Sequence, residues 1–194
     1  WEPEGEGAKE LPPLFLPAEG ASWGEAFRRQ LGALNPDVEV TTSQGGQPGP
    51  LIEGCALALL GVWDEARAEL AEAFWRVGKP ALAGEAKGWR GWAAVALPGG
   101  PCPRCLAARG VEFLPPGTAP GPEPCAVTVG SLLALEAMKV LLDIGESRRG
   151  SLYRLDLWDL RLEREEPPGE AGCSSCGAGT GGGAERPTPK KETS

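Results

Sequence analysis

Histidine is absent from this sequence of 194 residues, and this absence limits the chemistry that the protein can perform. Histidine is the usual general base near neutral pH and the most common metal ligand in proteins. Any acid–base step must therefore use a carboxylate, a lysine, an arginine or a thiolate. A metal centre must be built from cysteine or from carboxylates.

The sequence also lacks an excess of basic residues and a long uninterrupted apolar run. It has 19 Lys and Arg against 27 Asp and Glu, which gives a formal net charge of −8. This charge opposes non-specific attraction to nucleic-acid phosphates and to an anionic membrane surface. No apolar run reaches the roughly 18 residues of a membrane-spanning helix, and residues 1–4 are unlike a signal peptide. We therefore expect a cytoplasmic protein with neither a nucleic acid nor a membrane as its partner.

Four of the six cysteines form two Cys-x-x-Cys pairs, Cys102 with Cys105 and Cys173 with Cys176. In a reducing cytoplasm such pairs indicate a metal site rather than disulfides. Two such turns supply the four thiolates of a tetrahedral zinc site, which is structural because no coordination position stays open. The alternative is a redox dithiol or cysteines paired by chance. A redox site needs a reactive cysteine at a helix N-terminus, whereas prolines flank Cys102 and a loop is predicted after it.

Apolar periodicity and capping residues predict an alternation of helices and strands. Ser22 and Glu25 form a capping box ahead of a helix that stops at Asn35. Residues 127–142 are apolar nearly all round, which predicts a helix buried by its own domain or by a partner. The other predicted elements are a helix over 64–77 and strands over 38–41, 55–62, 80–83, 89–97, 151–157 and 160–165. This order indicates an α/β fold with a mainly parallel sheet and flanking helices.

The length and the 41% hydrophobic content suit one core. We predict a single domain over residues 1–177, with Cys55 as a small core residue. Residues 178–194 consist largely of Gly, Thr, Pro and Lys and leave little to bury, so a disordered tail is expected there.

Five stretches, in chain order, resemble the ThiF/MoeB/HesA family of ubiquitin-activating-like enzymes. They are Ala-Leu-Asn-Pro-Asp-Val at 33–38, Gly-Lys-Pro at 78–80, Pro-Cys-Pro-Arg-Cys-Leu at 101–106, Gly-Ser-Leu-Leu-Ala-Leu-Glu-Ala-Met-Lys at 130–139 and Cys-Ser-Ser-Cys-Gly at 173–177. The resemblance implies a Rossmann-like fold that binds ATP and Mg²⁺ and carries a structural zinc ion. It also implies an adenylyltransferase that activates the C-terminal glycine of a ubiquitin-like sulfur-carrier protein, releases pyrophosphate and works as a homodimer or heterodimer.

The resemblance places two further site residues. Asp64 matches the position of the family's magnesium-holding aspartate, although the surrounding Asp-x-x-Asp-Asn motif is not kept and Asp64 could simply cap the following helix. Cys125 lies roughly where some relatives carry a catalytic thiol that accepts the activated protein or its sulfur. Trp89 and Trp92 could contact a carrier protein, but a strand core and edge explain them more simply.

The family's phosphate-binding Gly-x-Gly-x-x-Gly is not found ahead of a predicted helix. The formal match, Gly177, Gly179 and Gly182, falls in the tail and is read as a decoy. We therefore expect the chain alone to be inactive in adenylation. A second hypothesis is a catalytically degenerate homologue that keeps the fold, the zinc and the dimer surface and acts as a binding or structural subunit.

Overall fold

The computed structural model describes residues 22–41, 49–116, 123–145, 150–170 and 172–177. The chain divides into two compact units, Trp1–Cys55 and Ala56–Ser194, which are described separately below. The predicted disordered tail and most of the predicted Gly-x-Gly-x-x-Gly decoy lie outside the described residues. The single domain over 1–177 stays a prediction.

The first unit contains α1 (Trp23–Leu34) and the short α2 (Gly49–Gly54). The predicted cap of α1 is confirmed, because the Ser22 hydroxyl accepts a hydrogen bond of 3.2 Å from the Glu25 N–H. The strand predicted over 38–41 is wrong. The Asn35 side chain accepts from the Asp37 N–H at 3.1 Å and its carbonyl accepts from the Val38 N–H at 3.3 Å, so a local turn uses these donors in place of a sheet ladder.

The second unit is built on one five-stranded sheet in the order β1 (Ala58–Leu60), β2 (Ala81–Lys87), β3 (Arg90–Ala96), β4 (Ser151–Asp156) and β5 (Arg161–Glu165). The α/β class is confirmed, but the described sheet is mixed rather than mainly parallel. β1 and β2 pair parallel, whereas the other three pairings are antiparallel. Gly88, at a φ of 56°, allows a two-residue turn that folds β2 and β3 into a hairpin.

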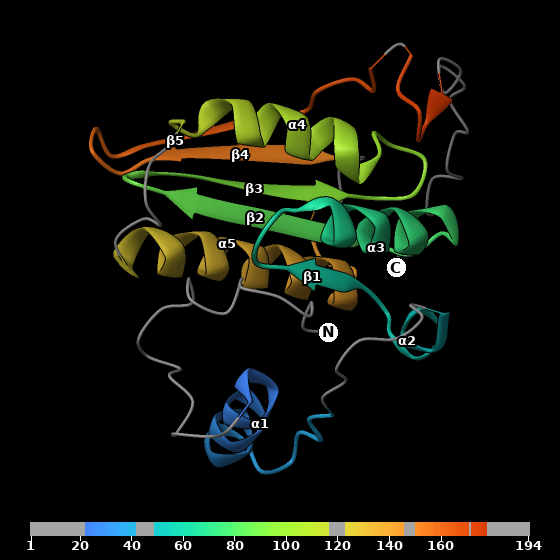
Figure 1. Ribbon diagram of the computed structural model, residues 1–194, viewed down its shortest axis with the longest axis vertical. Helices are drawn as coiled ribbons and strands as arrows, with labels where there is room; N and C mark the ends of the chain where they lie inside the picture. Colours follow the sequence, from blue (N-terminus) through green and yellow to red (C-terminus); the bar gives the residue numbers. More distant parts are fainter. Residues whose placement is uncertain (1–21, 42–48, 117–122, 146–149, 171, 178–194) are drawn as a thin grey trace, which may run out of the picture. The chain divides into compact units, whose positions relative to one another are not determined.

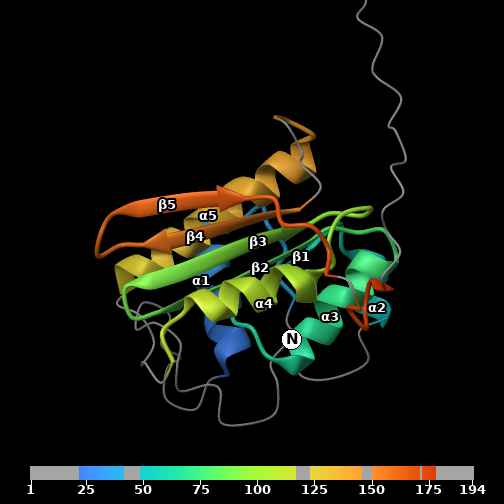
Figure 2. The same cartoon turned by 90° about the horizontal axis from the view of Figure 1, so that it is seen from above.

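Helices cover both faces of this sheet. Figures 1 and 2 show α5 (Glu123–Leu142) on one face and α3 (Glu65–Arg76) with α4 (Pro103–Phe113) on the other. Val129 and Leu133 of α5 pack with Leu82 and Val95 of the strands in the main hydrophobic cluster. On the opposite face the fully buried Trp92 lies so close to Gly110 of α4 that a Cβ at Gly110 would come within 2.4 Å of the indole.

The helix α4 was not predicted, because the sequence around it reads as proline- and glycine-rich loop. Pro103 stands at the first helical position, where its missing N–H costs nothing. Gly110 of this helix leaves room for the Trp92 ring. The predicted strand over 55–62 is reduced to Ala58–Leu60, and Cys55 is exposed, so its assignment to the core is wrong.

The helix α5 is longer than predicted and is buried on one face. Cys125, Val129 and Leu133 are buried, while Leu135 and Met138 are more than half exposed. By length and composition residues 124–142 would also suffice to cross a membrane, and among the described residues this is the one helix that would. The contact of one face with β2 and β3 is the arrangement of a helix laid across a sheet.

Candidate metal centre

The sulfur atoms of Cys102, Cys105, Cys173 and Cys176 all lie within 4.8 Å of one another. The sulfur–sulfur distances are 3.6 Å for Cys102 to Cys105, 3.7 Å for Cys102 to Cys173 and 3.6 Å for Cys105 to Cys176. A disulfide requires sulfurs about 2.05 Å apart, so these are four thiol or thiolate groups. Four thiolates bound to zinc at about 2.3 Å in a tetrahedron lie about 3.8 Å apart, which the observed separations fit closely.

The first pair is positioned by the start of α4. Cys102 is the residue before the helix, with φ −70° and ψ 161°, and Cys105 lies in the first turn. Gly150, at a φ of 106°, lies against the ring of Pro101, and a Cβ there would be 2.8 Å from the proline Cδ. Pro101, which directly precedes the first cysteine pair, therefore packs against Gly150, which directly precedes β4.

The second pair lies on a tight turn. The Cys173 N–H donates to the Glu170 carbonyl at 3.2 Å, and the Gly177 N–H donates to the Cys173 carbonyl at 2.9 Å. Gly177 adopts a φ of 64°, a conformation that glycine reaches without strain. The Glu170 N–H also donates to the Cys105 sulfur at 3.4 Å, so the backbone of the second turn supports a sulfur of the first.

Burial sets the proton affinity of the sulfurs. It raises the pKa of Cys102, and it raises the pKa of Cys105 to about 11. Burial also opposes ionisation of Cys173, but the backbone N–H groups of Cys176 and Ser175 outweigh it and lower the pKa of Cys173 to about 6. Binding of a divalent cation would therefore displace protons from the first pair.

Cys102 stands at the N-terminus of α4, so the loop predicted after it is wrong. This position is one that a redox dithiol would need. A reactive dithiol needs an accessible thiol with a lowered pKa. Cys102 is 0% and Cys105 2% exposed, and the pKa of each is raised. Since both thiols also face the second cysteine pair, the geometry favours a metal site.

Asp64 caps α3 and lies just after β1. Its carboxylate accepts a hydrogen bond of 2.8 Å from the Arg67 N–H and also pairs with the Arg67 guanidinium. These contacts give Asp64 a structural role that needs no metal. Its role in holding Mg²⁺ and ATP stays a prediction.

Cys125 lies in the first turn of α5 and is fully buried. Burial, with a smaller contribution from the negative charge of Asp156, raises the pKa of its thiol. The thiol is therefore protonated at neutral pH in this conformation. A catalytic role for Cys125 stays a prediction, and it would require the first turn of α5 to open.

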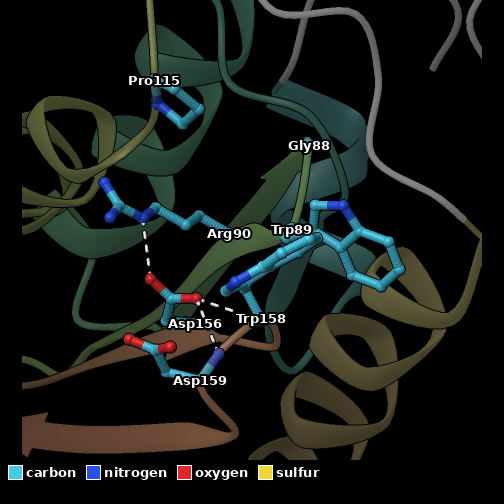
Figure 3. A pocket seen from close by; sticks show the side chains of 7 residues that line it. All are labelled: Gly88, Trp89, Arg90, Pro115, Asp156, Trp158 and Asp159. Atoms are coloured by element: carbon cyan, nitrogen blue, oxygen red, sulfur yellow. Dashed lines mark hydrogen bonds and ion pairs between the residues drawn. The ribbon is translucent and has the colours of Figure 1, made fainter.

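The two hairpin turns of the sheet form a shallow hollow of about 290 Å³. Figure 3 shows its lining residues, which are Gly88, Trp89, Arg90, Pro115, Asp156, Trp158 and Asp159. The Trp89 and Trp158 rings meet edge to face with centroids 5.8 Å apart, and the Arg90 Nε donates to the Asp156 carboxylate at 2.9 Å. Sequence reasoning singled out Trp89 but missed Trp158, which comes beside it through the pairing of β3 with β4. Trp92 belongs to the core, as the simpler interpretation predicted.

Comparison with known proteins places this geometry in context. No protein-family model matches the chain. The SAMP-activating enzyme E1 of Haloferax volcanii is 37% identical to it over 111 residues, which cover 53% of this chain and 39% of that protein. In sequence, about half of the chain is thus similar to part of an E1 enzyme.

Solved structures match the chain at the level of the fold. E. coli MccB bound to ATP matches with a TM-score of 0.63 at 12% identity, over 87% of this chain and 57% of MccB. E. coli MccB in another crystal structure matches with a TM-score of 0.63 at 11% identity, over 93% of this chain and 56% of MccB. The chain thus spans little more than half of MccB and less than half of the curated relative.

Proposed function

We propose that this chain is the metal-bearing part of an E1-like adenylyltransferase that activates the C-terminal glycine of a ubiquitin-like sulfur-carrier protein. The observation that carries the proposal is the cluster of four cysteine sulfurs within 4.8 Å in a chain related to a SAMP-activating E1. The ion is zinc, because four thiolates at tetrahedral spacing are its preferred structural ligands. Its role is architectural, since all four positions are filled by cysteine.

In the proposed reaction a carboxylate oxygen of the carrier's terminal glycine attacks the α-phosphorus of ATP. The bond to the β-phosphate oxygen breaks, pyrophosphate leaves, and the carrier becomes an acyl-adenylate. Magnesium, when bound, would neutralise charge on the phosphates, and Asp64 is the residue of this chain that would hold it. To do so, the carboxylate must exchange its contact with the Arg67 guanidinium for the ion.

Binding of the nucleotide phosphates needs backbone N–H groups at a helix N-terminus that follows a glycine loop. The sequence has no Gly-x-Gly-x-x-Gly ahead of any of its described helices. The proposal therefore requires a companion subunit, or residues beyond this sequence, to supply that loop. It also keeps the expected homodimer or heterodimer and the cytoplasmic location.

A second candidate function is a catalytically degenerate subunit that keeps the zinc-bearing fold and binds a carrier or an active partner. Two observations favour it. Asp64 is already engaged as a helix cap, and Cys125 is buried with a raised pKa. Under this interpretation the centre stabilises a binding scaffold and the chain performs no adenylation.

Carrier-dependent exchange of pyrophosphate into ATP separates the two candidates. The full-length protein is assayed with the ubiquitin-like carrier from its own genome, and a carrier that lacks its terminal glycine serves as the control. Exchange that depends on the terminal glycine supports the enzyme. Exchange by a companion subunit alone, which addition of this protein does not increase, supports the degenerate scaffold.

The metal is tested separately by its amount. We expect about one zinc ion per chain after purification without chelators, and a strong loss of zinc in Cys176→Ser. Cys55→Ser is the matched control, since Cys55 is exposed and far along the chain from both pairs. A metal-free wild-type protein of unchanged stability would contradict the proposed centre.

A further inference from the structure

Arg104 connects the candidate metal centre to the helix α3. It is one of the two residues between Cys102 and Cys105, and it lies in the first turn of α4. Its side chain reaches across to α3, where the two terminal nitrogens contact the Glu65 carboxylate at 3.0 and 2.5 Å. Its Nε lies 3.1 Å from the Glu72 carboxylate. One guanidinium therefore joins two carboxylates of the neighbouring helix.

The two acidic residues lie on the same face of α3, because seven residues correspond to about two helical turns. Their environments differ. The Glu65 side chain is 72% exposed, whereas the Glu72 side chain is 8% exposed. A carboxylate with so little solvent needs a cation nearby, because an unpaired buried charge is strongly unfavourable. Arg104 supplies that cation at 3.1 Å, and Arg76 of α3 itself lies farther from Glu72, at 3.6 Å.

The guanidinium is suited to this position because its planar fork binds one carboxylate through two nitrogens and leaves Nε for another. A lysine could contact one carboxylate but not span both. The C-terminal end of α3 has a contact that does not involve Arg104, since the Trp75 indole N–H donates to the Leu97 carbonyl at 3.0 Å. The part of α3 that Arg104 contacts is therefore its first two turns, residues 65–72.

We infer that Arg104 is a positioning residue through which the metal centre holds the first two turns of α3, residues 65–72, against α4. The inference rests on the proposed metal binding. Metal bound to Cys102 and Cys105 fixes the turn that contains the Arg104 backbone. The Arg104 side chain, fixed in this way, holds Glu65 and Glu72 in place through its ion pairs. Asp64 is the N-cap of α3 and directly precedes these two turns. The metal centre would therefore help to set the position of this candidate magnesium ligand.

Amide hydrogen exchange of the zinc-loaded, full-length protein tests this role. In Arg104→Gln we expect unchanged zinc content, with amides in residues 68–72 exchanging about tenfold faster and those of α5 unchanged. Arg76→Gln is the matched control, because it removes a cation near Glu72 from α3 without touching the cysteine turn. In Arg76→Gln the exchange rates of the amides in residues 68–72 should increase much less.

Metal removal gives the second arm. In the wild-type protein, removal of zinc by a chelator should speed exchange in residues 68–72 more than in α5. In Arg104→Gln the same treatment should add little to exchange in these residues, because the connection is already lost. Arg104→Lys, which keeps the charge, should fall between the two, and it replaces Arg104→Gln if that variant does not fold.

The outcomes separate this inference from the function on which it rests. Absence of zinc from the wild-type protein overturns both the metal proposal and the inference. Bound zinc with wild-type exchange in Arg104→Gln overturns the inference alone. An equal response of α3 and α5 to chelation also overturns it, because the effect of the metal would then not pass through Arg104.

Discussion

Two cysteines outside the metal centre differ sharply in their surroundings. Cys55 is exposed, whereas Cys125 is fully buried and its pKa is raised by burial. We predict that a thiol-alkylating reagent at neutral pH modifies Cys55 well before Cys125, because only an accessible thiolate reacts rapidly. Peptide mass spectrometry of the zinc-loaded protein measures the order. Rapid modification of Cys125 would contradict the buried conformation and favour the predicted catalytic thiol.

The raised pKa of Cys125 also fixes the direction of a pH effect. Because the folded state favours the neutral Cys125 thiol, the contribution of this thiol to stability is fully present below the pKa that Cys125 has in the unfolded chain. That contribution is lost as the pH rises through the higher pKa of the folded protein. Reaction of Cys125 should therefore increase on the alkaline side, and Cys125→Ser should be less sensitive than the wild type to alkaline unfolding. Equal alkaline sensitivity of the two proteins would argue against burial as the cause.

Asp64 offers a way to separate a structural cap from a magnesium ligand. Asp64→Ala removes the acceptor for the Arg67 N–H and should lower the free energy of unfolding by about 1 kcal/mol. Asp64→Asn keeps a side-chain oxygen that can cap the helix, so it should lower the free energy of unfolding much less. It also removes the negative charge that a magnesium ion needs. Urea denaturation measures the first effect and pyrophosphate exchange the second. Equal activity of wild type and Asp64→Asn in an active complex would remove Asp64 from the magnesium site.

Sequence reasoning succeeded for residues whose roles depend on near neighbours. The spacing of Cys102 and Cys105 and that of Cys173 and Cys176 limit each pair to one tight turn, and their combination into one site follows from zinc's need for four ligands. It could not find Arg104 as a connection to Glu72 or Trp158 as the neighbour of Trp89. Those contacts join residues far apart in sequence, and neither leaves a periodic or spacing signal.

Among the elements, α4 makes the most specific steric demand. A Cβ at Gly110 would lie 2.4 Å from the buried Trp92 ring, whereas a Cβ at Gly130 of α5 meets no atom within 4 Å. We predict that Gly110→Ala destabilises the protein by about 1–3 kcal/mol through overpacking. The matched variant Gly130→Ala should stabilise it by about 0.5–1 kcal/mol, because it removes glycine from a helix interior. Urea denaturation of both variants checks the opposite signs, and a stable Gly110→Ala would contradict the packing of α4 on β3.

Element prediction worked where local chemistry determines the boundary. Ser22 and Asp64 cap their helices as the sequence suggested, and the last two strands are found within a few residues of their predicted limits. It failed at α4, where Pro103 and Gly110 read as breakers although one favours a helix start and the other serves packing. It also failed for strand direction, because an apolar run carries no information on whether its neighbour is parallel.

At the scale of the whole molecule, the metal centre joins two segments that are 71 residues apart in sequence. We predict that chelation lowers the melting temperature and creates a new site of proteolytic cleavage in the chain after β5, residues 166–177. The reason is that this segment contacts α4 through the cysteine cluster and through the Glu170 N–H, 3.4 Å from the Cys105 sulfur, while the Arg109–Glu170 ion pair is weak at 4.0 Å. Limited proteolysis before and after chelation, with zinc added back, measures this. A new cleavage that appears on chelation at another place, and not in residues 166–177, would show that another part of the fold depends on the metal more strongly.

The path of the chain after β5 joins the sheet to the cysteine cluster. The sheet carries β4 and β5 antiparallel to their neighbours, and the chain after β5 returns to the start of α4, where the first cysteine pair lies. Figure 2 shows this return of the chain from β5 toward the region of α3 and α4. A fold comparison at 12% identity supports the architecture, whereas the activity depends on the exchange experiment.

The separation of 71 residues between the two cysteine pairs has a consequence for synthesis on the ribosome. At elongation rates of about 5–20 residues per second, the second pair is made roughly 4–14 s after the first. During that interval Cys102 and Cys105 have emerged without their partners, and β4 and β5 have not yet been completed. The nascent chain therefore passes through a period in which half of a metal site is open to oxidants or to foreign ions. Under the proposed zinc binding, cells short of reducing capacity or of zinc should lose this protein during its synthesis, before the finished fold is ever at risk.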